Sequence, residues 1–554
     1  MLKDATVAAI GRQYRAELVS ILLMSMYIGV FLNIPIFVRK YYQVDESVVG
    51  LFLTDAIFTV TTCCFLLCVT SIAGRRVLSA AIIAFTFVSV IASYYMWFFD
   101  VIIGYGVVKA VFGTGMSLVI ESMGLGLLTF SSIFCLGPLY FLHRIAPNYQ
   151  APWLLFLIPR FLCIGLLTVC LILINSHYKN FRDPTADGRI PTNPIGVAAY
   201  SYVPINWMAA SIISVANTIA NSQLKNKLID PMDTYGFYPE IPLDDIFVVV
   251  VIGESARYDH MSLIDYQRAT TPLLDKETNV IGFKGASCNT STKLSLSCMF
   301  VREGGTEDLG SPSQQYVYEN HVFSVLKNLG FSIDLFSMQS EAGFYVQVNA
   351  DIVKIREEIG AEASSQGLPV IDDMLLVNQM TQSISKKAGK HLVILHQKGS
   401  HFNYSSRYPT EFSKYKPDCK DMHCDFQAMV NSYDNSIVYT DYFLFSLLER
   451  LRDKKAFLLY ASDHGESMED GKHFHAAPKD VAPDEQFKIP VIMWASDSLL
   501  ENTQFAEGFD MLKQHESKNR IVRHVEIFES LLGCLGINSD HQGIRSLNNW
   551  CSRK

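Results

Sequence analysis

Charged side chains are scarce in this chain: Asp, Glu, Lys and Arg account for 18% of the 554 residues, whereas hydrophobic residues account for 49%. So low a charge content argues against a wholly soluble protein and indicates that part of the chain lies in a membrane. The cysteines after residue 178 show no paired Cys-x-x-Cys spacing, which argues against a zinc–cysteine site. The first apolar run continues apolar to Val38 without a small-residue cleavage site, which argues against a cleaved signal peptide.

The apolar residues are concentrated before residue 178. Five runs there are long enough, or nearly so, to cross about 30 Å of hydrocarbon: Leu18–Val38, Val49–Ala73, Val77–Phe99, Met123–Leu142 and Phe161–Ser176. We therefore predict an α-helical membrane domain of five transmembrane helices over residues 1–177. An interfacial linker with helices at the membrane surface is expected over 178–244, and an external domain over 245–554.

The basic residues predict the orientation of these helices. Three groups fall on the same face of the membrane: Lys3, Arg12 and Arg15, then Arg75 and Arg76, then His143 and Arg144. By the positive-inside rule this face is cytoplasmic, so everything after about residue 178 is external. Arg160 lies at the cytoplasmic end of the fifth run, where it is expected either to snorkel toward the surface or to pair with another helix.

Cysteine usage changes at the same boundary. Six cysteines lie inside apolar runs, where free thiols behave as small hydrophobic side chains. The other six all lie in the external half, and their even number fits an oxidising compartment. Proximity in the sequence favours three pairs among the 15 possible connectivities: Cys288 with Cys298, Cys419 with Cys424, and Cys534 with Cys551.

The external half shows the pattern of an α/β domain. Short apolar runs alternate with helical segments, and such runs are typical of a mostly parallel sheet that is buried on both faces: 246–252, 332–336, 392–395, 456–460 and 489–494. Three polar motifs directly follow predicted strands, at Gly253–Arg257, Gly399–His401 and Ser462–Glu466. Ligands in open α/β sheets bind beyond the carboxyl ends of the strands, so we expect these motifs to converge.

Two carboxylates and one imidazole in these motifs predict a metal site. Glu254, Asp463 and His464 form a donor set that suits Zn²⁺ better than Mn²⁺ or Ca²⁺. A fourth position is left for a hydroxyl, whose pKa a bound zinc ion would lower. Thr292 lies at the centre of the segment 287–298, between Cys288 and Cys298. The spacing alone does not separate it from the nearby hydroxyls of Thr290, Ser291 and Ser295.

Two histidines are candidates for proton transfer at the same site. His401 follows the third predicted strand and His475 lies in the segment 473–478. Each is expected to carry protons or to bind a second zinc ion. An ordinary surface or core role is the alternative for each, and the neighbouring His473 is a weaker candidate.

Four motifs in this order resemble one family of enzymes. They are GESARYDH at 253–260, SCNTSTKLSLSC at 287–298, GSHFNY at 399–404, and SDHGES at 462–467 followed by FHAAP at 474–478. The chain is similar over nearly its whole length to the membrane phosphoethanolamine transferases of Gram-negative bacteria, in the alkaline phosphatase and sulfatase superfamily. The resemblance implies that Thr292 is the nucleophile and a zinc ligand, with Glu254, Asp463 and His464 as the other ligands.

The same resemblance implies a location and two substrates. The catalytic domain would lie in the periplasm, anchored in the inner membrane, and the protein would act as a monomer without nucleic acid. Phosphatidylethanolamine would be the donor, and His401 and His475 would lie near the phosphoethanolamine. No CxPxR segment surrounds Thr292, so sulfate ester hydrolysis is not expected.

Several stretches resemble the branch of the family that modifies the outer Kdo sugar of Kdo2-lipid A. They include LSCMFVREGGTED at 296–308 and NNWC at 548–551. The branch that modifies lipid A phosphate is the alternative acceptor class, and a glycerol-phosphate transferase is the alternative reaction. Segment 338–344 contains no lysine, whereas the lipid A phosphate branch often has one near the substrate phosphate.

Overall fold

The computed structural model describes most of the chain. The described residues are 2–41, 48–98, 103, 107–108, 125–145, 157–179, 202–212, 215, 228–308, 315–339, 341–365, 372–385, 388–419, 424–468, 475–477, 479 and 482–552. Those up to 212 form one compact unit, and those from 215 onward form a second. The predicted linker 178–244 lies partly outside the described residues. Of its described parts, 202–212 belong to the first unit and 228–244 to the second.

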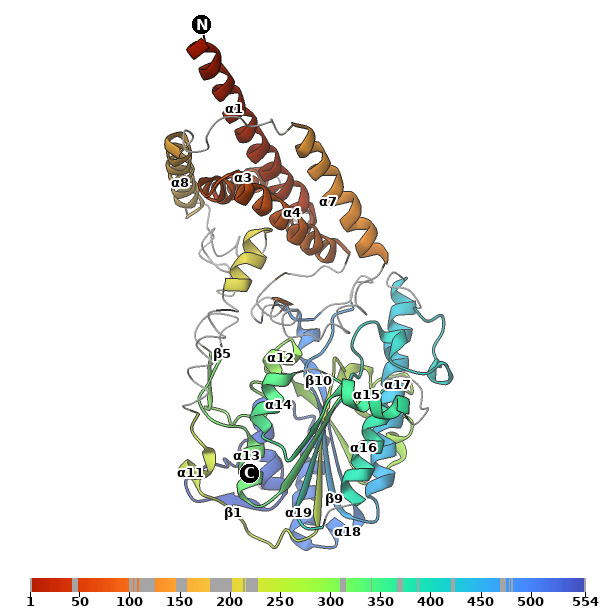
Figure 1. The fold of residues 1–554 in the computed structure, drawn as a ribbon. Helices are drawn as coiled ribbons and strands as arrows, with labels where there is room; N and C mark the ends of the chain where they lie inside the picture. Colours follow the sequence, from red (N-terminus) through yellow and green to blue (C-terminus); the bar gives the residue numbers. More distant parts are fainter. Residues whose placement is uncertain are drawn as a thin grey trace. The chain divides into compact units, whose positions relative to one another are not determined.

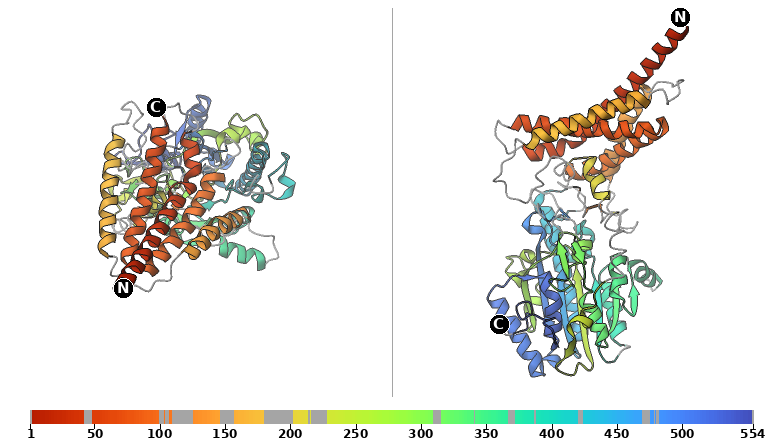
Figure 2. Two further views of the ribbon diagram at one scale, coloured as in Figure 1. Left: turned by 90° about the horizontal axis from the view of Figure 1, so that it is seen from above. Right: turned by 90° about the vertical axis from the view of Figure 1, so that its left-hand side faces the viewer.

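The first unit is built from apolar helices (Figure 1). They are α1 (Leu2–Gly29), η1 (Phe31–Asn33), α2 (Ile34–Tyr41), α3 (Val48–Ile72), α4 (Arg75–Phe98), α7 (Leu125–Ile145) and α8 (Leu157–Lys179). Helix α3 packs against α1, α4 and α8, and α7 packs against α4 (Figure 2). Four described stretches are long and apolar enough to cross a membrane: Tyr14–Val38, Phe52–Ile72, Arg75–Phe98 and Leu157–Ile174. Leu125–Tyr140 is a shorter apolar helix, so the fifth span stays a prediction.

A buried ion pair accounts for the charge near the start of α8. Nη2 of Arg160 lies 2.6 Å from Oε1 of Glu17 on α1, and both side chains are almost completely buried. Of the two alternatives for Arg160, pairing with another helix is therefore confirmed. Such a pair is costly to break, because the remaining charge would be left buried without a counter-ion.

Residues 202–212 are fixed to the helices of the first unit by buried polar contacts. Asn33 donates to the carbonyl oxygen of Val203 at 2.9 Å and accepts from its amide at 2.9 Å. The hydroxyl of Tyr202 donates to Asp55 on α3 at 2.5 Å. Buried polar groups that are all hydrogen-bonded specify a single packing, so this segment has one defined position in the unit.

The second unit contains a mixed sheet of eight strands among its described residues. The order is β11-β3-β10-β9-β2-β8-β6-β7. The strands are β2 (Ile246–Gly253), β3 (Val280–Ala286), β6 (Ser332–Ser337), β7 (Ile352–Lys354), β8 (His391–His396), β9 (Lys455–Ser462), β10 (Lys488–Ala495) and β11 (Val522–Arg523). Two antiparallel pairs lie outside it: β1 (Phe237–Pro239) with β12 (Ile537–Ser539), and β4 (Thr306–Asp308) with β5 (Gln315–Val317).

All five predicted strands are present, but the direction of one was predicted wrongly. Strand β10 runs antiparallel to both of its neighbours, β3 and β9. A parallel return requires a crossover, usually through a helix. Between β9 and β10 the described residues instead form loops and one 3₁₀ turn, Asp484–Gln486. The buried apolar pattern of β10 predicts a strand but does not encode its direction.

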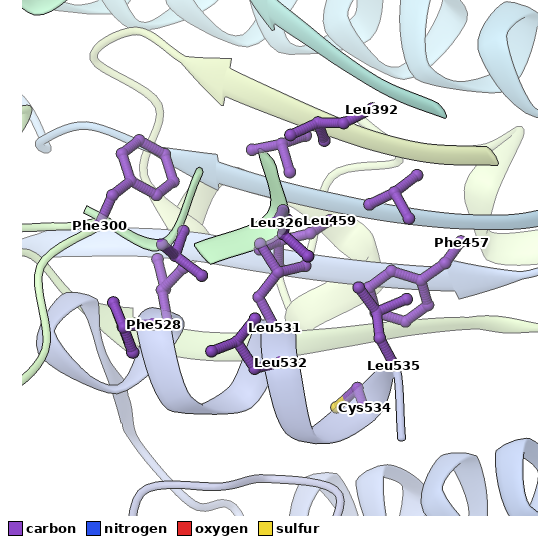
Figure 3. Close-up of a cluster of buried hydrophobic side chains, with 14 of the residues drawn as sticks. Phe300, Leu326, Leu392, Phe457, Leu459, Phe528, Leu531, Leu532, Cys534 and Leu535 are labelled. Carbon is purple, nitrogen blue, oxygen red and sulfur yellow. The ribbon is translucent and has the colours of Figure 1, made fainter. Parts of the chain in front are cut away.

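Helices cover both faces of the sheet (Figures 1 and 2). They are α11 (Pro231–Tyr235), α12 (Thr292–Ser295), α13 (Val322–Asn328), α14 (Ala342–Val348), α15 (Arg356–Ser365), α16 (Met374–Ser385), α17 (Phe426–Leu451), α18 (Asp497–Leu500), α19 (Thr503–Ser517) and α20 (Ile527–Cys534). Alternate residues of β2 face opposite cores. Val248 and Val250 pack with α13, α14, α19 and α20, whereas Val249 and Val251 pack with α15, α16 and α17. Figure 3 shows Phe528, Leu531 and Leu532 of α20 beside Leu459 of β9 in the first core.

Three disulfides join the cysteines of the second unit. They link Cys288 to Cys298, Cys419 to Cys424, and Cys534 to Cys551. The three pairs predicted from proximity are thereby confirmed. Each bond closes a short loop and stabilises the fold mainly by restricting the unfolded chain.

A buried histidine predicts that the second unit loses stability in mild acid. His321 lies beside the rings of Phe323 and Phe344, and burial lowers its pKa from 6.5 to about 4. Between these pH values the unfolded chain binds a proton that the folded chain does not, so stability falls as the pH falls. Between pH 7 and pH 5, the titration of this histidine lowers the free energy of unfolding by about 2 kcal/mol.

The variant His321→Leu should remove that contribution. We expect the drop in unfolding free energy between pH 7 and pH 5, measured by denaturant titration of the detergent-solubilised chain, to be smaller by about 2 kcal/mol. An equal drop in both proteins would contradict the assignment. The exposed His541, changed to Leu, is the matched control and should leave the drop unchanged.

Candidate active site

Polar motifs from two neighbouring strands meet at the carboxyl edge of the sheet. Glu254 directly follows β2, and Asp463 and His464 directly follow β9, which pairs with β2 in parallel. All three side chains are fully buried. One potential ligand atom from each lies within 4.8 Å of those of the other two. The structure therefore brings together the three residues whose types suggested a metal site.

The hydrogen bonds of this cluster leave its ligand atoms pointing inward. Oδ1 of Asp463 accepts from the amides of Ser255 at 3.1 Å and His464 at 2.8 Å, whereas Oδ2 is buried and has no partner among the described residues. Nδ1 of His464 donates to the carbonyl oxygen of Gly465 at 2.8 Å. Nε2 is then the ring nitrogen that faces the two carboxylates, 3.4 Å from Oε1 of Glu254 and 3.5 Å from Oδ2 of Asp463.

The electrostatics of the cluster favour a cation. Burial raises the pKa of Asp463, and the neighbouring carboxylate of Glu254 raises it further. Burial also acts to raise the pKa of Glu254, but the hydrogen bond and charge of His464 outweigh it and hold that pKa well below its usual range. A buried carboxylate oxygen without a partner, beside a second carboxylate and an imidazole, fits a divalent metal ion.

Thr292 is the hydroxyl that reaches the cluster. It begins α12, and its Oγ1 donates to Oε2 of Glu254 at 3.0 Å and lies 3.4 Å from Nε2 of His464. Two of the neighbouring hydroxyls have other contacts: Thr290 donates to the carbonyl oxygen of Ala477, and Ser295 donates to that of Asn289. The hydroxyl of Ser291 is buried and has no hydrogen-bond partner among the described residues, so it makes no bond to the cluster. The geometry thus separates Thr292 from neighbours that the spacing alone could not distinguish.

A disulfide and a hydrogen bond restrict the segment that carries Thr292. The disulfide between Cys288 and Cys298 joins its two ends, and the hydroxyl of Ser287 donates to the carbonyl oxygen of Asn289 at 2.6 Å. These bonds restrict the backbone around the threonine. A nucleophile held in one position needs no further ordering when it reacts.

The two predicted histidines lie next to the cluster. The ring of His475 is 4.5 Å from that of His464 and 5.8 Å from that of His401, measured between centroids. Nδ1 of His401 donates to the carbonyl oxygen of Phe402 at 2.6 Å, and burial lowers the pKa of His401 to about 4. His401 is therefore neutral at pH 7, with Nε2 able to accept a proton. His473 lies outside the described residues.

One side chain in contact with the cluster was not predicted from the sequence. Nε2 of Gln339 donates to Oε2 of Glu254 at 3.0 Å, the same oxygen that accepts from Thr292. Gln339 lies two residues beyond the end of β6, at the same edge of the sheet. The strand-end argument that singled out Glu254 and Asp463, applied to β6, would have found it.

A buried carboxylate fixes the loop that carries His401. Asp373 accepts from the amides of Lys398 at 2.8 Å and Gly399 at 2.9 Å. Gly399 has a φ of +47°, and a Cβ there would lie 2.9 Å from the carbonyl oxygen of Glu254. Asp373 thus holds the loop against the backbone of Glu254, and only glycine fits that approach.

We expect Asp373→Asn to lower turnover. Its amide group would place an N–H against one of the two backbone amides and leave that donor buried without an acceptor. A shift of the His401 loop by a fraction of an ångström is expected to reduce kcat by roughly 10- to 100-fold. Steady-state kinetics of the purified variant, with metal content measured in parallel, is the test. Turnover within twofold of the wild type would show that the loop holds its position without Asp373.

Comparisons with known proteins identify the family of this chain. The family model described as "Sulfatase" matches residues 246–537, and that described as "Phosphoethanolamine transferase EptA/EptB" matches 61–187. The Kdo(2)-lipid A phosphoethanolamine 7''-transferase of Escherichia coli is 40% identical over 550 residues, which cover 96% of each chain. The protein of the same description from Salmonella typhimurium is 39% identical over 542 residues, again 96% of each.

A solved structure resembles the whole chain. It is the integral membrane lipooligosaccharide phosphoethanolamine transferase A (EptA) from Neisseria meningitidis, with a TM-score of 0.80 and 22% identity. The match covers 96% of this chain and 98% of that one. At this identity the likeness establishes the fold: an N-terminal set of apolar helices followed by an α/β domain.

Proposed function

Because this chain belongs to the family of membrane phosphoethanolamine transferases, we propose that it transfers phosphoethanolamine from phosphatidylethanolamine to the outer Kdo sugar of Kdo2-lipid A. The observation that supports this acceptor is the 40% identity, along nearly the whole chain, to a transferase that is named for the same acceptor. Transfer to lipid A phosphate is the alternative within the family.

The proposed location is the inner membrane of a Gram-negative cell, with the catalytic domain in the periplasm. We assign residues 1–177 to a membrane domain of five spans, 178–244 to an interfacial linker and 245–554 to the catalytic domain. Three disulfides in the second unit support an oxidising compartment for it. Donor and acceptor are both lipids, so a membrane anchor brings the enzyme to their head groups. We propose that the protein acts as a monomer.

The proposed cofactor is Zn²⁺, held by Glu254, Asp463, His464 and Thr292. Two carboxylates and one imidazole, with the buried Oδ2 of Asp463 lacking a partner among the described residues, support this assignment. When bound there, the ion supplies Lewis-acid stabilisation of negative charge. We propose that His401 and His475 act as proton carriers, and a second zinc ion beside them is the alternative.

The proposed reaction has two half-reactions. In the first, Oγ1 of Thr292 forms a bond to the phosphorus of phosphatidylethanolamine, and the bond from phosphorus to the glycerol oxygen breaks. The proton of Thr292 is passed on to that oxygen, so diacylglycerol leaves. In the second, a sugar hydroxyl attacks the same phosphorus and the bond to Thr292 breaks, which returns a proton to Oγ1.

The contacts of this chain support those roles. Glu254 accepts the hydrogen bond of Thr292 and so orients its hydroxyl. His401 is neutral at pH 7 because burial lowers its pKa, and a neutral imidazole can accept a proton from a hydroxyl and deliver it to the leaving oxygen.

Mass spectrometry of lipopolysaccharide tests the proposed function. The chain is expressed in a strain that lacks such transferases, and the added group is located by fragmentation. We expect phosphoethanolamine on the outer Kdo. The same group on a lipid A phosphate would assign the other acceptor, and glycerol phosphate or no addition would contradict the proposed reaction.

A further inference from the structure

Lys293 is a cation beside the nucleophile that has no assigned role. It follows Thr292 in α12, and its side chain is partly exposed, whereas the next two residues, Leu294 and Ser295, are buried. Lys293 therefore lies on the open side of this short helix. Consecutive Cα atoms are about 3.8 Å apart, and the lysine ammonium sits on a flexible four-carbon stem. A phosphoryl group on Oγ1 of Thr292 is within its reach.

The other cations around the cluster have partners. Arg257 pairs with Asp259 at 2.8 Å, and Lys488 pairs with Glu485 at 3.2 Å. Arg407 donates to the carbonyl oxygens of His401 and Phe402. For Lys293, by contrast, the described part of the chain provides neither an ion pair nor a hydrogen bond to its ammonium. No described residue therefore neutralises its charge.

The charges of the site call for such a cation. Glu254, Asp463 and Glu466 are three fully buried carboxylates close to Thr292 or His475. Both proposed substrates are anionic: the donor carries a phosphodiester, and the acceptor carries sugar carboxylates and phosphates. The proposed Zn²⁺ would offset part of this negative charge, and a lysine beside it would add further positive charge for a substrate anion. Segment 338–344, at the end of β6, supplies no lysine or arginine.

We propose that Lys293 binds an oxyanion of the substrate at the reacting phosphorus or beside it. The oxyanion is either a non-bridging oxygen of the phosphoethanolamine phosphate or the acid group of the acceptor. This inference rests on the proposed function, because it assumes a phosphoryl group on Thr292. The disulfide between Cys288 and Cys298 restricts the backbone of Lys293 as it does that of Thr292. The side chain that carries the ammonium is therefore attached at a defined position.

The test measures the two half-reactions separately on the full-length protein in nanodiscs that contain phosphatidylethanolamine. Without acceptor, diacylglycerol release and the phosphoethanolamine carried by the protein report the first step. Adding Kdo2-lipid A to the loaded protein reports the second. Lys293→Met removes the charge and Lys293→Arg keeps it. Lys513→Met, on the exposed side of α19, is the matched control.

We expect Lys293→Met to slow one half-reaction by roughly 10- to 100-fold, the usual effect of losing a charged hydrogen bond. A slower first step identifies the donor phosphate as the ligand, and a slower second step with a higher KM for Kdo2-lipid A identifies the acceptor. Lys293→Arg should recover most of the rate. Thermal unfolding should be unchanged in both variants, because the Lys293 ammonium makes no hydrogen bond or ion pair with any described residue.

Two results would overturn the inference. The first is that both half-reactions of Lys293→Met stay within twofold of Lys513→Met. The second is that the wild-type protein forms no phosphoethanolamine adduct, which contradicts the proposed function and the role of Lys293 with it. The first result leaves the proposed function intact, so the two failures are distinguishable.

Discussion

Thr292→Ala is expected to abolish phosphoethanolamine transfer and leave the protein folded. Alanine removes the oxygen that is proposed to form the bond to phosphorus, and the loss of a nucleophile typically costs roughly 10⁴-fold or more in turnover. The structural cost is small, because Thr292 is only partly buried and loses its hydrogen bond to Glu254 and the longer one to His464, each worth about 1 kcal/mol. Transfer is measured with purified protein, phosphatidylethanolamine and Kdo2-lipid A.

Two further variants distinguish the role of the Thr292 hydroxyl from that of the surrounding segment 287–298. Thr292→Ser keeps an Oγ and should retain part of the activity, whereas Ser297→Ala removes a hydroxyl that donates only to the carbonyl oxygen of Leu294 and should be fully active. Normal transfer by Thr292→Ala would show that the nucleophile lies elsewhere. Loss of activity in Ser297→Ala as well would mean that the assay reports whether the disulfide-closed segment 287–298 is folded, rather than whether the nucleophile is present.

Asp463→Asn is expected to lower metal content and activity together. Its Oδ1 can still accept from the amides of Ser255 and His464, so the turn after β9 is preserved. The amide nitrogen, however, replaces Oδ2, the oxygen that faces the cluster without a partner among the described residues. Losing a direct ligand should lower metal affinity or activity by at least the roughly 10- to 100-fold that changes to outer-shell residues cause.

Elemental analysis of the purified variant is the measurement, with transfer activity recorded on the same sample. Treating the wild type with a chelator should reproduce the loss, and added zinc should restore the wild type but not Asp463→Asn. The matched control is Asp265→Asn, because Asp265 is exposed and pairs only with Lys284. A variant that is fully active without bound metal would remove the metal from the mechanism.

Much of the fold was predictable because buried strands have a strong local signature. The apolar run at 246–252 became β2, with alternate valines in two cores. Direction was not predictable, since β10 has the same buried apolar pattern as the mutually parallel strands β2, β8 and β9, and its reversal depends on the loops after β9. Strands β3, β7 and β11 were missed: β7 and β11 are very short, and β3 carries Gly282, Gly285 and Lys284.

The candidate site was predictable where its residues follow strands directly. Glu254, Asp463 and His464 were singled out by residue type and strand-end position, and the structure places them together. Gln339 was missed because the strand-end argument was not applied to β6, and Asp373 was missed because it acts only through a contact with residues distant in the sequence. Nothing in the local pattern around Arg160 indicated which helix it meets, and only packing brings Glu17 to it.

The most direct test of Thr292 as the nucleophile is a peptide map of the protein after exposure to phosphatidylethanolamine without acceptor. Proteolysis and tandem mass spectrometry locate any added group within the segment 287–298. We expect one phosphoethanolamine on Thr292, which disappears when Kdo2-lipid A is added and does not form in Thr292→Ala. A stable adduct on another residue, or efficient transfer without any adduct on Thr292, would contradict the central claim.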